Sequence, residues 1–198
     1  MAIIGLTTLR HLLDEAITYG DLSAAKKLVA EGLRIAQEWD WSSEIAYFKA
    51  QREIIEGNDR DAMIYLDLAI KHNPCDGAAY NDRALCMIEL GMVQEAFLYF
   101  DKGIASEPDY ANIYHNKGWL LNQLGQHQEA LPFFEKALAL EPDRAVTFEN
   151  LADTYIHLKE VQKAISALRK AAQLLTLSQL KIKEQIDAKI EILVKGTM

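Results

Sequence analysis

Small residues and prolines recur along this chain with a period of 34 residues. Proline does so in one column, and alanine or glycine does so in four others. The columns are Pro74, Pro108 and Pro142; Ala62, Ala96, Ala130 and Ala164; Ala50, Ala84, Gly118 and Ala152; Gly57, Gly91 and Gly125; and Ala69, Gly103, Ala137 and Ala171. A fixed period of this length predicts a solenoid in which each unit buries its apolar face against its neighbours. Such solenoids usually hold other molecules rather than transform them.

Each unit is predicted to form two antiparallel helices. In residues 111–144, apolar or small side chains follow helical spacing in two runs. Gly125 separates the runs, because glycine accepts the left-handed backbone that ends many helices. Pro142 ends the second run, because proline cannot continue a helix. Both helices are amphipathic but short, so neither is expected to be stable without its neighbours.

The 34-residue unit resembles the tetratricopeptide repeat (TPR). Residues 111–144 match the pattern best, through Tyr114, Gly118, Leu121, Gly125, Ala130, Phe134, Ala137 and Pro142. Residues 77–110 match nearly as well. Residues 145–178 depart from it at Lys159 in place of glycine and Thr176 in place of proline, and residues 43–76 depart at Glu53. The resemblance implies an all-α fold, a TPR solenoid built as a right-handed superhelix of antiparallel helix pairs.

The predicted organisation is a single TPR domain over residues 1–198, ending in a C-terminal capping helix. Its parts are a degenerate helix pair at 6–39, repeats at 43–76, 77–110, 111–144 and 145–178, and the capping helix at 179–195. That last segment has apolar residues on one helical face, namely Ile182, Ile186, Ile190 and Leu193. Thr176 and Gln179 have the spacing of a capping box at its start. The helix either covers the last repeat or serves as a dimerisation or docking helix.

Composition and motifs exclude several classes of function. The net charge, 21 − 29 = −8, argues against nucleic acid or an anionic membrane as the main partner. No apolar stretch is long enough for membrane insertion, and the N-terminus lacks the features of a signal peptide. Cys75 and Cys86 fit no metal or redox spacing, so a reducing, cytoplasmic location is expected. No catalytic, cofactor or metal motif appears, so no enzymatic activity and no cofactor are expected.

The TPR resemblance implies that the first helix of each pair lines a concave groove for an extended peptide or a partner helix. The candidate binding residues on this lining are Asn81, Asp82, Asn112, His115, Asn116, Trp119, Asn122, Glu149, Asn150 and Asp153. The first-helix lining of the four repeats holds five acidic residues and no Lys or Arg. A cleft of one charge favours a ligand of the opposite charge, although these acids could instead simply solvate an exposed face.

Asparagine is the second notable component of this lining. Asn116 and Asn150 are 34 residues apart, and an amide offers both donors and an acceptor to a ligand backbone. The alternative is that they are ordinary polar residues of a wet surface. Trp119 suits either a ligand anchor or helix packing. The basic residues with which some TPR proteins clamp a C-terminal carboxylate are missing at the corresponding positions.

Two hypotheses for function follow. The first is a non-enzymatic adaptor or co-chaperone-like scaffold that holds a neutral or basic peptide in an acidic, asparagine-containing groove. The second is a structural assembly protein that self-associates or docks through its ends, with homo-oligomers formed through the C-terminal helix. Candidate surfaces for the second are Ile3, Ile4 and Leu6, the tryptophans Trp39 and Trp41, and the C-terminal amphipathic helix.

Overall fold

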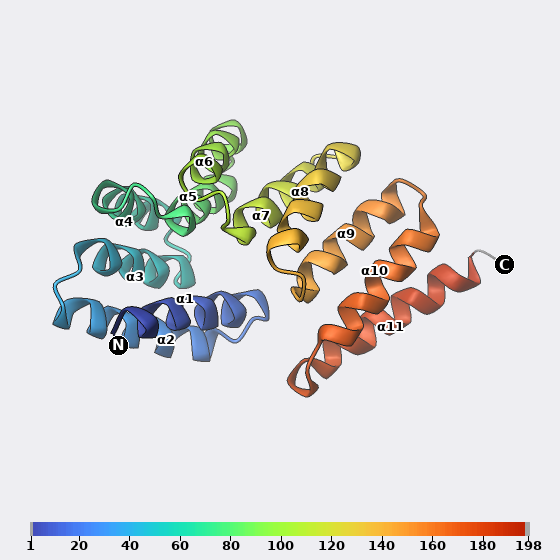
Figure 1. The fold of residues 1–198 in the computed structure, drawn as a ribbon, viewed down its shortest axis with the longest axis horizontal. Helices are drawn as coiled ribbons and strands as arrows, with labels where there is room; N and C mark the ends of the chain where they lie inside the picture. Colours follow the sequence, from blue (N-terminus) through green and yellow to red (C-terminus); the bar gives the residue numbers. More distant parts are fainter. Residues whose placement is uncertain (1, 197–198) are drawn as a thin grey trace. The chain divides into compact units, whose positions relative to one another are not determined.

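The structure, a computed structural model, describes the backbone of residues 2–196 and the side chains of residues 5–196. Within these residues it is helical throughout, with no strand, which confirms the all-α prediction (Figure 1). The helices are α1 (Ala2–Thr18), α2 (Leu22–Glu38), α3 (Ser42–Ile55), α4 (Asp59–His72), α5 (Gly77–Glu89), α6 (Val93–Ser106), α7 (Ala111–Gln123), α8 (His127–Leu140), α9 (Ala145–His157), α10 (Val161–Leu174), the 3-10 helix η1 (Leu177–Gln179) and α11 (Leu180–Lys195).

The helices form two compact units, Met1–Pro108 and Asp109–Met198. In unit 1, α1, α3 and α5 each pack against the next helix, and α2 and α4 each pack against the first helix of the following pair. Unit 2 repeats this pattern with α7 to α10, and α11 packs against α10. This succession is that of a TPR solenoid. The assignment of the whole chain to one domain, and the repeat boundaries within it, remain predictions.

At Gly32 and Gly118, aromatic rings occupy the space that a larger side chain would need. Phe48, Phe100 and Phe134 are fully buried, as are the alanines of the Ala62 column. A Cβ atom added to Gly32 would lie 2.3 Å from the Phe48 ring. At Gly118 it would lie 3.2 Å from the Phe134 ring, which is tighter than ordinary contact. Small residues are therefore required where helix backbones approach these rings.

The turn between the two helices of each repeat has one residue with left-handed backbone. Gly57, Gly91 and Gly125 have φ of 78°, 78° and 77°. Lys159, the next member of this 34-residue column, has φ of 62°. Its amide donates to the Ile156 carbonyl, as the amide of Gly125 does to that of Asn122. The fourth turn therefore keeps the geometry of the others despite lacking glycine.

Replacing Lys159 with glycine is expected to raise the free energy of unfolding by about 0.5–1 kcal/mol. The left-handed conformation costs a non-glycine residue about 1–2 kcal/mol, and part of this gain is offset by the extra freedom of glycine in the unfolded chain. Urea unfolding checks this, with Gly125→Lys as the reciprocal variant. Gly125→Lys places a non-glycine residue in the same left-handed conformation, so it is expected to lower the free energy of unfolding. Shifts of the same sign for the two substitutions, or a loss of stability in Lys159→Gly, would contradict the strain argument.

The C-terminal helix packs onto the last helix pair within unit 2. Ile186 is buried in a cluster with residues of α9 and α10, and three further side chains of the same face pack against that cluster: Ile182, Ile190 and Leu193. The predicted capping box is confirmed, since both of its halves are formed between Thr176 and Gln179. The apolar face of α11 is therefore directed at its own unit.

The surfaces considered for self-association differ in exposure. The side chains of Ile3 and Ile4 lie outside the described residues, and Leu6 is buried, so it offers no exposed surface. Trp39 is 59% exposed and stacks on Trp41 with 5.9 Å between ring centroids. Near the C-terminus three aliphatic side chains are exposed: Leu177, Leu180 and Ile192. Self-association through these surfaces remains a prediction.

No helix of residues 2–196 has both the length and the apolar character needed to cross a bilayer.

Candidate ligand-binding faces

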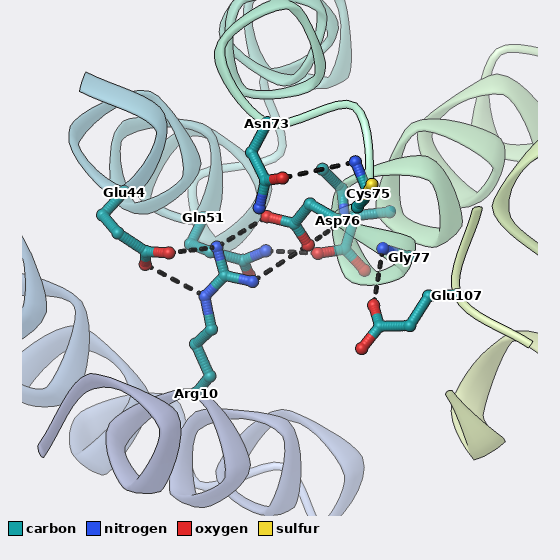
Figure 2. Close-up of polar contacts among 10 residues, drawn as sticks. Arg10, Glu44, Gln51, Asn73, Cys75, Asp76, Gly77 and Glu107 are labelled. Atoms are coloured by element: carbon teal, nitrogen blue, oxygen red, sulfur yellow. Dashed lines mark hydrogen bonds and ion pairs between the residues drawn. The ribbon is translucent and has the colours of Figure 1, made fainter. Parts of the chain in front are cut away.

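An arginine from the first helix joins three successive first helices in unit 1 (Figure 2). The Arg10 guanidinium donates to both carboxylate oxygens of Glu44, at 3.1 Å each, and to both of Asp76, at 3.0 and 2.8 Å. Its carbon lies 3.6 Å from the ring centroid of Tyr47. Asp76 also caps α5 by accepting from the Ala79 amide at 3.1 Å. One cation thus binds two carboxylates and an aromatic face.

The charged state of Arg10 is strongly favoured in this position. Burial by itself would lower the pKa of the guanidinium, but Asp76, Tyr47 and Glu44 together raise it above its ordinary value. The Arg10 side chain is 20% exposed and that of Asp76 only 3%. The group is therefore a largely buried ion-pair network in which every charged member has a partner.

Asn81 and Asp82 contact each other and α3. Gln51 donates to Asp82 Oδ2 at 2.5 Å, and Asn81 donates to Asp82 Oδ1 at 3.0 Å. Burial raises the pKa of Asp82 to about 6, although these hydrogen bonds and one from Tyr47 oppose the shift. Asn81 is itself buried. The predicted binding residues of unit 1 are thus brought together, as a mostly buried polar cluster.

In unit 2, His115 connects α7 to α9. Its Nδ1 lies 2.9 Å from Thr147 Oγ1, and its Nε2 lies 3.3 Å from the Asn150 amide nitrogen. Burial, with a further contribution from Arg144, lowers the pKa of His115 to about 3. The ring is therefore neutral. The contacts favour a proton on Nδ1, which donates to Thr147, while Nε2 accepts from Asn150.

The other predicted site residues of α7 differ in how far they are buried. Asn112 and Asn122 are buried. Asn112 donates to the Tyr110 hydroxyl at 3.3 Å, and Asn122 Oδ1 lies 2.5 Å from His127 Nδ1. Asn116 and Trp119 are only partly buried. Asn116 and Trp119 are therefore more accessible than Asn112 and Asn122, which contact other side chains of the chain.

The acidic residues of α9 receive a cation from α11. Lys189 forms an ion pair with Asp153, and these side chains are 36% and 35% exposed. Burial raises the pKa of Glu149, and the charge of Lys189 opposes that shift. Glu149 and Asp153 are thus brought together beside a lysine of the C-terminal helix.

Arg10 and Lys189 are two cations next to the predicted lining that the sequence interpretation did not include. The prediction of a lining without Lys or Arg was limited to the first helices of the four repeats. In the folded chain, α1 and α11 each add a cation beside these carboxylates, since Arg10 pairs with Glu44 and Lys189 pairs with Asp153. The signal was available for Arg10, which lies 34 residues before Glu44 and therefore in the same column.

Among the described residues, no three histidine, cysteine, aspartate or glutamate side chains are grouped so as to hold a metal ion. His127 and His157 do meet, with parallel rings 4.3 Å apart between centroids. Burial and the neighbouring His157 lower the pKa of His127.

Two segments match models of the tetratricopeptide repeat, residues 111–144 and residues 145–174. No curated protein matches the sequence of this chain. Among solved structures, the chain is similar to TTC0263, a thermophilic TPR protein of Thermus thermophilus. The identity is 19%, the TM-score is 0.70, and the match covers 96% of this chain and 98% of that one.

Two further structures are similar in fold. For residues 41 to the end of MamA from Desulfovibrio magneticus RS-1, the identity is 23% and the TM-score 0.58, with 78% of this chain and 96% of that chain covered. For YrrB, described as a TPR protein with an unusual peptide-binding site, the identity is 17% and the TM-score 0.57, with coverage of 87% and 88%. The 34-residue period, the succession of helix pairs and the two matched segments together show that this chain has the fold of a TPR solenoid and that residues 111–174 are tetratricopeptide repeats.

Proposed function

We propose that this protein is a non-enzymatic adaptor or co-chaperone-like scaffold that holds a neutral or basic extended peptide or helix on the acidic, asparagine-containing faces of its first helices. TPR repeats are in general protein-interaction modules, and the repeat fold supports protein partners here. The observation that carries the finer proposal is that carboxylates on these faces already bind cationic side chains. Arg10 binds Glu44 and Asp76, and Lys189 binds Asp153.

The proposed contact residues in unit 2 are those with partial exposure. Asn116 and Asn150, in equivalent positions on α7 and α9, offer amide groups to a ligand backbone. Trp119 offers an aromatic surface, and Glu149 and Asp153 offer negative charge. The buried members of the predicted set, such as His115 and Asn112, act by fixing these helices. The peptide-binding site named for YrrB supports peptide recognition by analogy of fold.

The setting proposed for this function is the cytoplasm, without a cofactor or metal. Both cysteines are free thiols, and Cys75 is exposed. Exposed free thiols persist most readily in a reducing compartment.

A panel of fluorescent peptides with neutral, basic and acidic sequences tests the proposal. The wild-type chain is expected to bind the basic and neutral peptides more tightly than the acidic ones. Glu149→Lys with Asp153→Lys should weaken the basic peptides by about tenfold, because two attractions are lost and two repulsions are added.

The matched control is Glu129→Lys with Glu135→Lys. Both residues are exposed on α8, so this variant makes the same change in net charge away from the α9 acids. Circular dichroism establishes that both variants are folded. Equal weakening by the two double variants would reduce the effect to net charge and reject a specific site on α9.

A further inference from the structure

We infer that Lys189 is an internal competitor that occupies the Glu149–Asp153 pair and must give way before a Lys or Arg side chain of a partner can bind there. This inference rests on the proposed function and specifies how the site in unit 2 is regulated. The C-terminal helix then has two roles, since it covers the last repeat and also limits the affinity of the α9 acids for a basic ligand.

The contact has the geometry of an exchangeable ion pair. The Lys189 ammonium reaches Asp153 from a neighbouring helix, and about a third of each side chain is exposed. Its positive charge also reaches Glu149. Lysine has a flexible four-carbon stem, so the ammonium can leave while the backbone of α11 stays in place.

The helix that carries Lys189 is fixed by other residues. Ile186 is 2% exposed within the cluster that includes α9 and α10, and Ile182 and Ile190 pack against the same cluster. Release of Lys189 therefore requires no exposure of apolar surface. The competing step is a side-chain movement, which occurs without undocking of α11.

Comparison with Arg10 explains why the competitor is Lys189. Arg10 binds two carboxylates in a forked arrangement, lies on an aromatic ring, and has a nearly buried partner in Asp76. Such bidentate pairs are geometrically demanding and strong. Lys189 has one ion-pair partner in Asp153, at a partly exposed position. The carboxylates of both units therefore accept cations, but only the site in unit 2 is held weakly enough for exchange.

The size of the effect follows from the weakness of exposed ion pairs. Such pairs typically correspond to a factor of about 1.4 to 5 in an equilibrium constant. Removing the Lys189 charge is therefore expected to strengthen the binding of a basic peptide by about two- to fivefold.

The experiment measures the binding of a fluorescein-labelled peptide of alternating glycine and lysine by anisotropy at low ionic strength. The variants are Lys189→Gln and, as the control, Lys195→Gln. Lys195 pairs with Glu191 on the same helix, so both variants remove one positive charge and one ion pair from α11. Only Lys189 contacts an acid of α9. The third protein is the Glu149→Lys, Asp153→Lys double variant.

Tighter binding by Lys189→Gln, with Lys195→Gln equal to wild type, supports the inference. If both lysine variants bind like wild type while the double variant loses binding, competition by Lys189 is wrong and the proposed function stands. If the double variant binds the peptide as well as wild type does, the α9 acids are not the site, and both proposals fail.

Discussion

Replacing Arg10 with methionine is expected to lower the free energy of unfolding of unit 1 by about 2–4 kcal/mol. The substitution keeps most of the apolar volume of the side chain but leaves Glu44 and Asp76 without their cation. Breaking a buried ion pair by removing one partner typically costs about 3–5 kcal/mol, and the 20% exposure of Arg10 and Glu44 reduces that figure. Asp76, at 3% exposure, accounts for most of the loss.

Urea unfolding with hydrogen exchange of unit 1 measures this effect, and Arg34→Met is the control. Arg34 also pairs with two carboxylates, Glu31 and Glu38, but all three side chains are about half exposed on α2. A much smaller loss is expected there, since exposed pairs contribute little. Adding Glu44→Gln and Asp76→Asn to Arg10→Met should recover part of the stability, because the unpaired charges are then gone. Similar losses for Arg10→Met and Arg34→Met would show that burial of the network is unimportant.

The helix pairs could be predicted because their determinants are local. Glycine in the turn and proline after the second helix recur every 34 residues, and each acts on the backbone within a few residues. The positions that require a small residue could also be read from this period. The side chain that packs against each small residue could not be predicted, because it can come from another helix pair, as the Phe48 ring against Gly32 does.

The candidate site was less predictable because its interactions join residues about one repeat apart. Its first-helix position predicts that His115 lines the groove, yet His115 is buried against Thr147, 32 residues later. Period alone assigns a residue to a helix face, but exposure depends on which polar partner the adjacent helix supplies. For Arg10 the 34-residue spacing places it in the column of Glu44, but the pairing with Asp76, 66 residues later, depends on how α1, α3 and the start of α5 pack.

The two departures of the fourth repeat, Lys159 and Thr176, are accommodated in different ways. Lys159 was recognised as a departure from glycine, but only the structure shows that the turn retains its left-handed backbone. Thr176 replaces the proline and begins a capping box with Gln179. In the first case the tertiary fold imposes its geometry on an unfavourable residue, whereas in the second the local sequence provides another way to end one helix and begin the next.

Acidification from pH 7 to pH 5 is expected to lower the free energy of unfolding of unit 2 by about 2 kcal/mol through His115 alone. Burial lowers the pKa of this histidine to about 3, whereas in the unfolded chain it returns to its ordinary value near 6.5. Between these values the unfolded state binds more protons, so the contribution of His115 to stability is fully present above about pH 6.5 and is lost as pH falls toward the folded pKa.

Asp82 has the opposite effect in unit 1. Burial raises its pKa to about 6, so that unit gains stability as this carboxyl is protonated.

Hydrogen exchange at pH 7 and pH 5, corrected for the intrinsic rates, separates these effects by unit, and His115→Asn is the decisive variant. Asparagine can still donate to Thr147 but does not titrate. The variant also loses the contact between the imidazole and the Phe134 ring, so it is expected to be less stable than wild type at pH 7.

The informative quantity is therefore the change in protection with pH within each protein. Wild-type unit 2 should become less protected at pH 5, and the variant should retain more of its own pH 7 protection. Equal pH dependence in the two proteins would mean that His115 can be protonated in the folded state at little cost, and that the link it forms between α7 and α9 tolerates the charged ring.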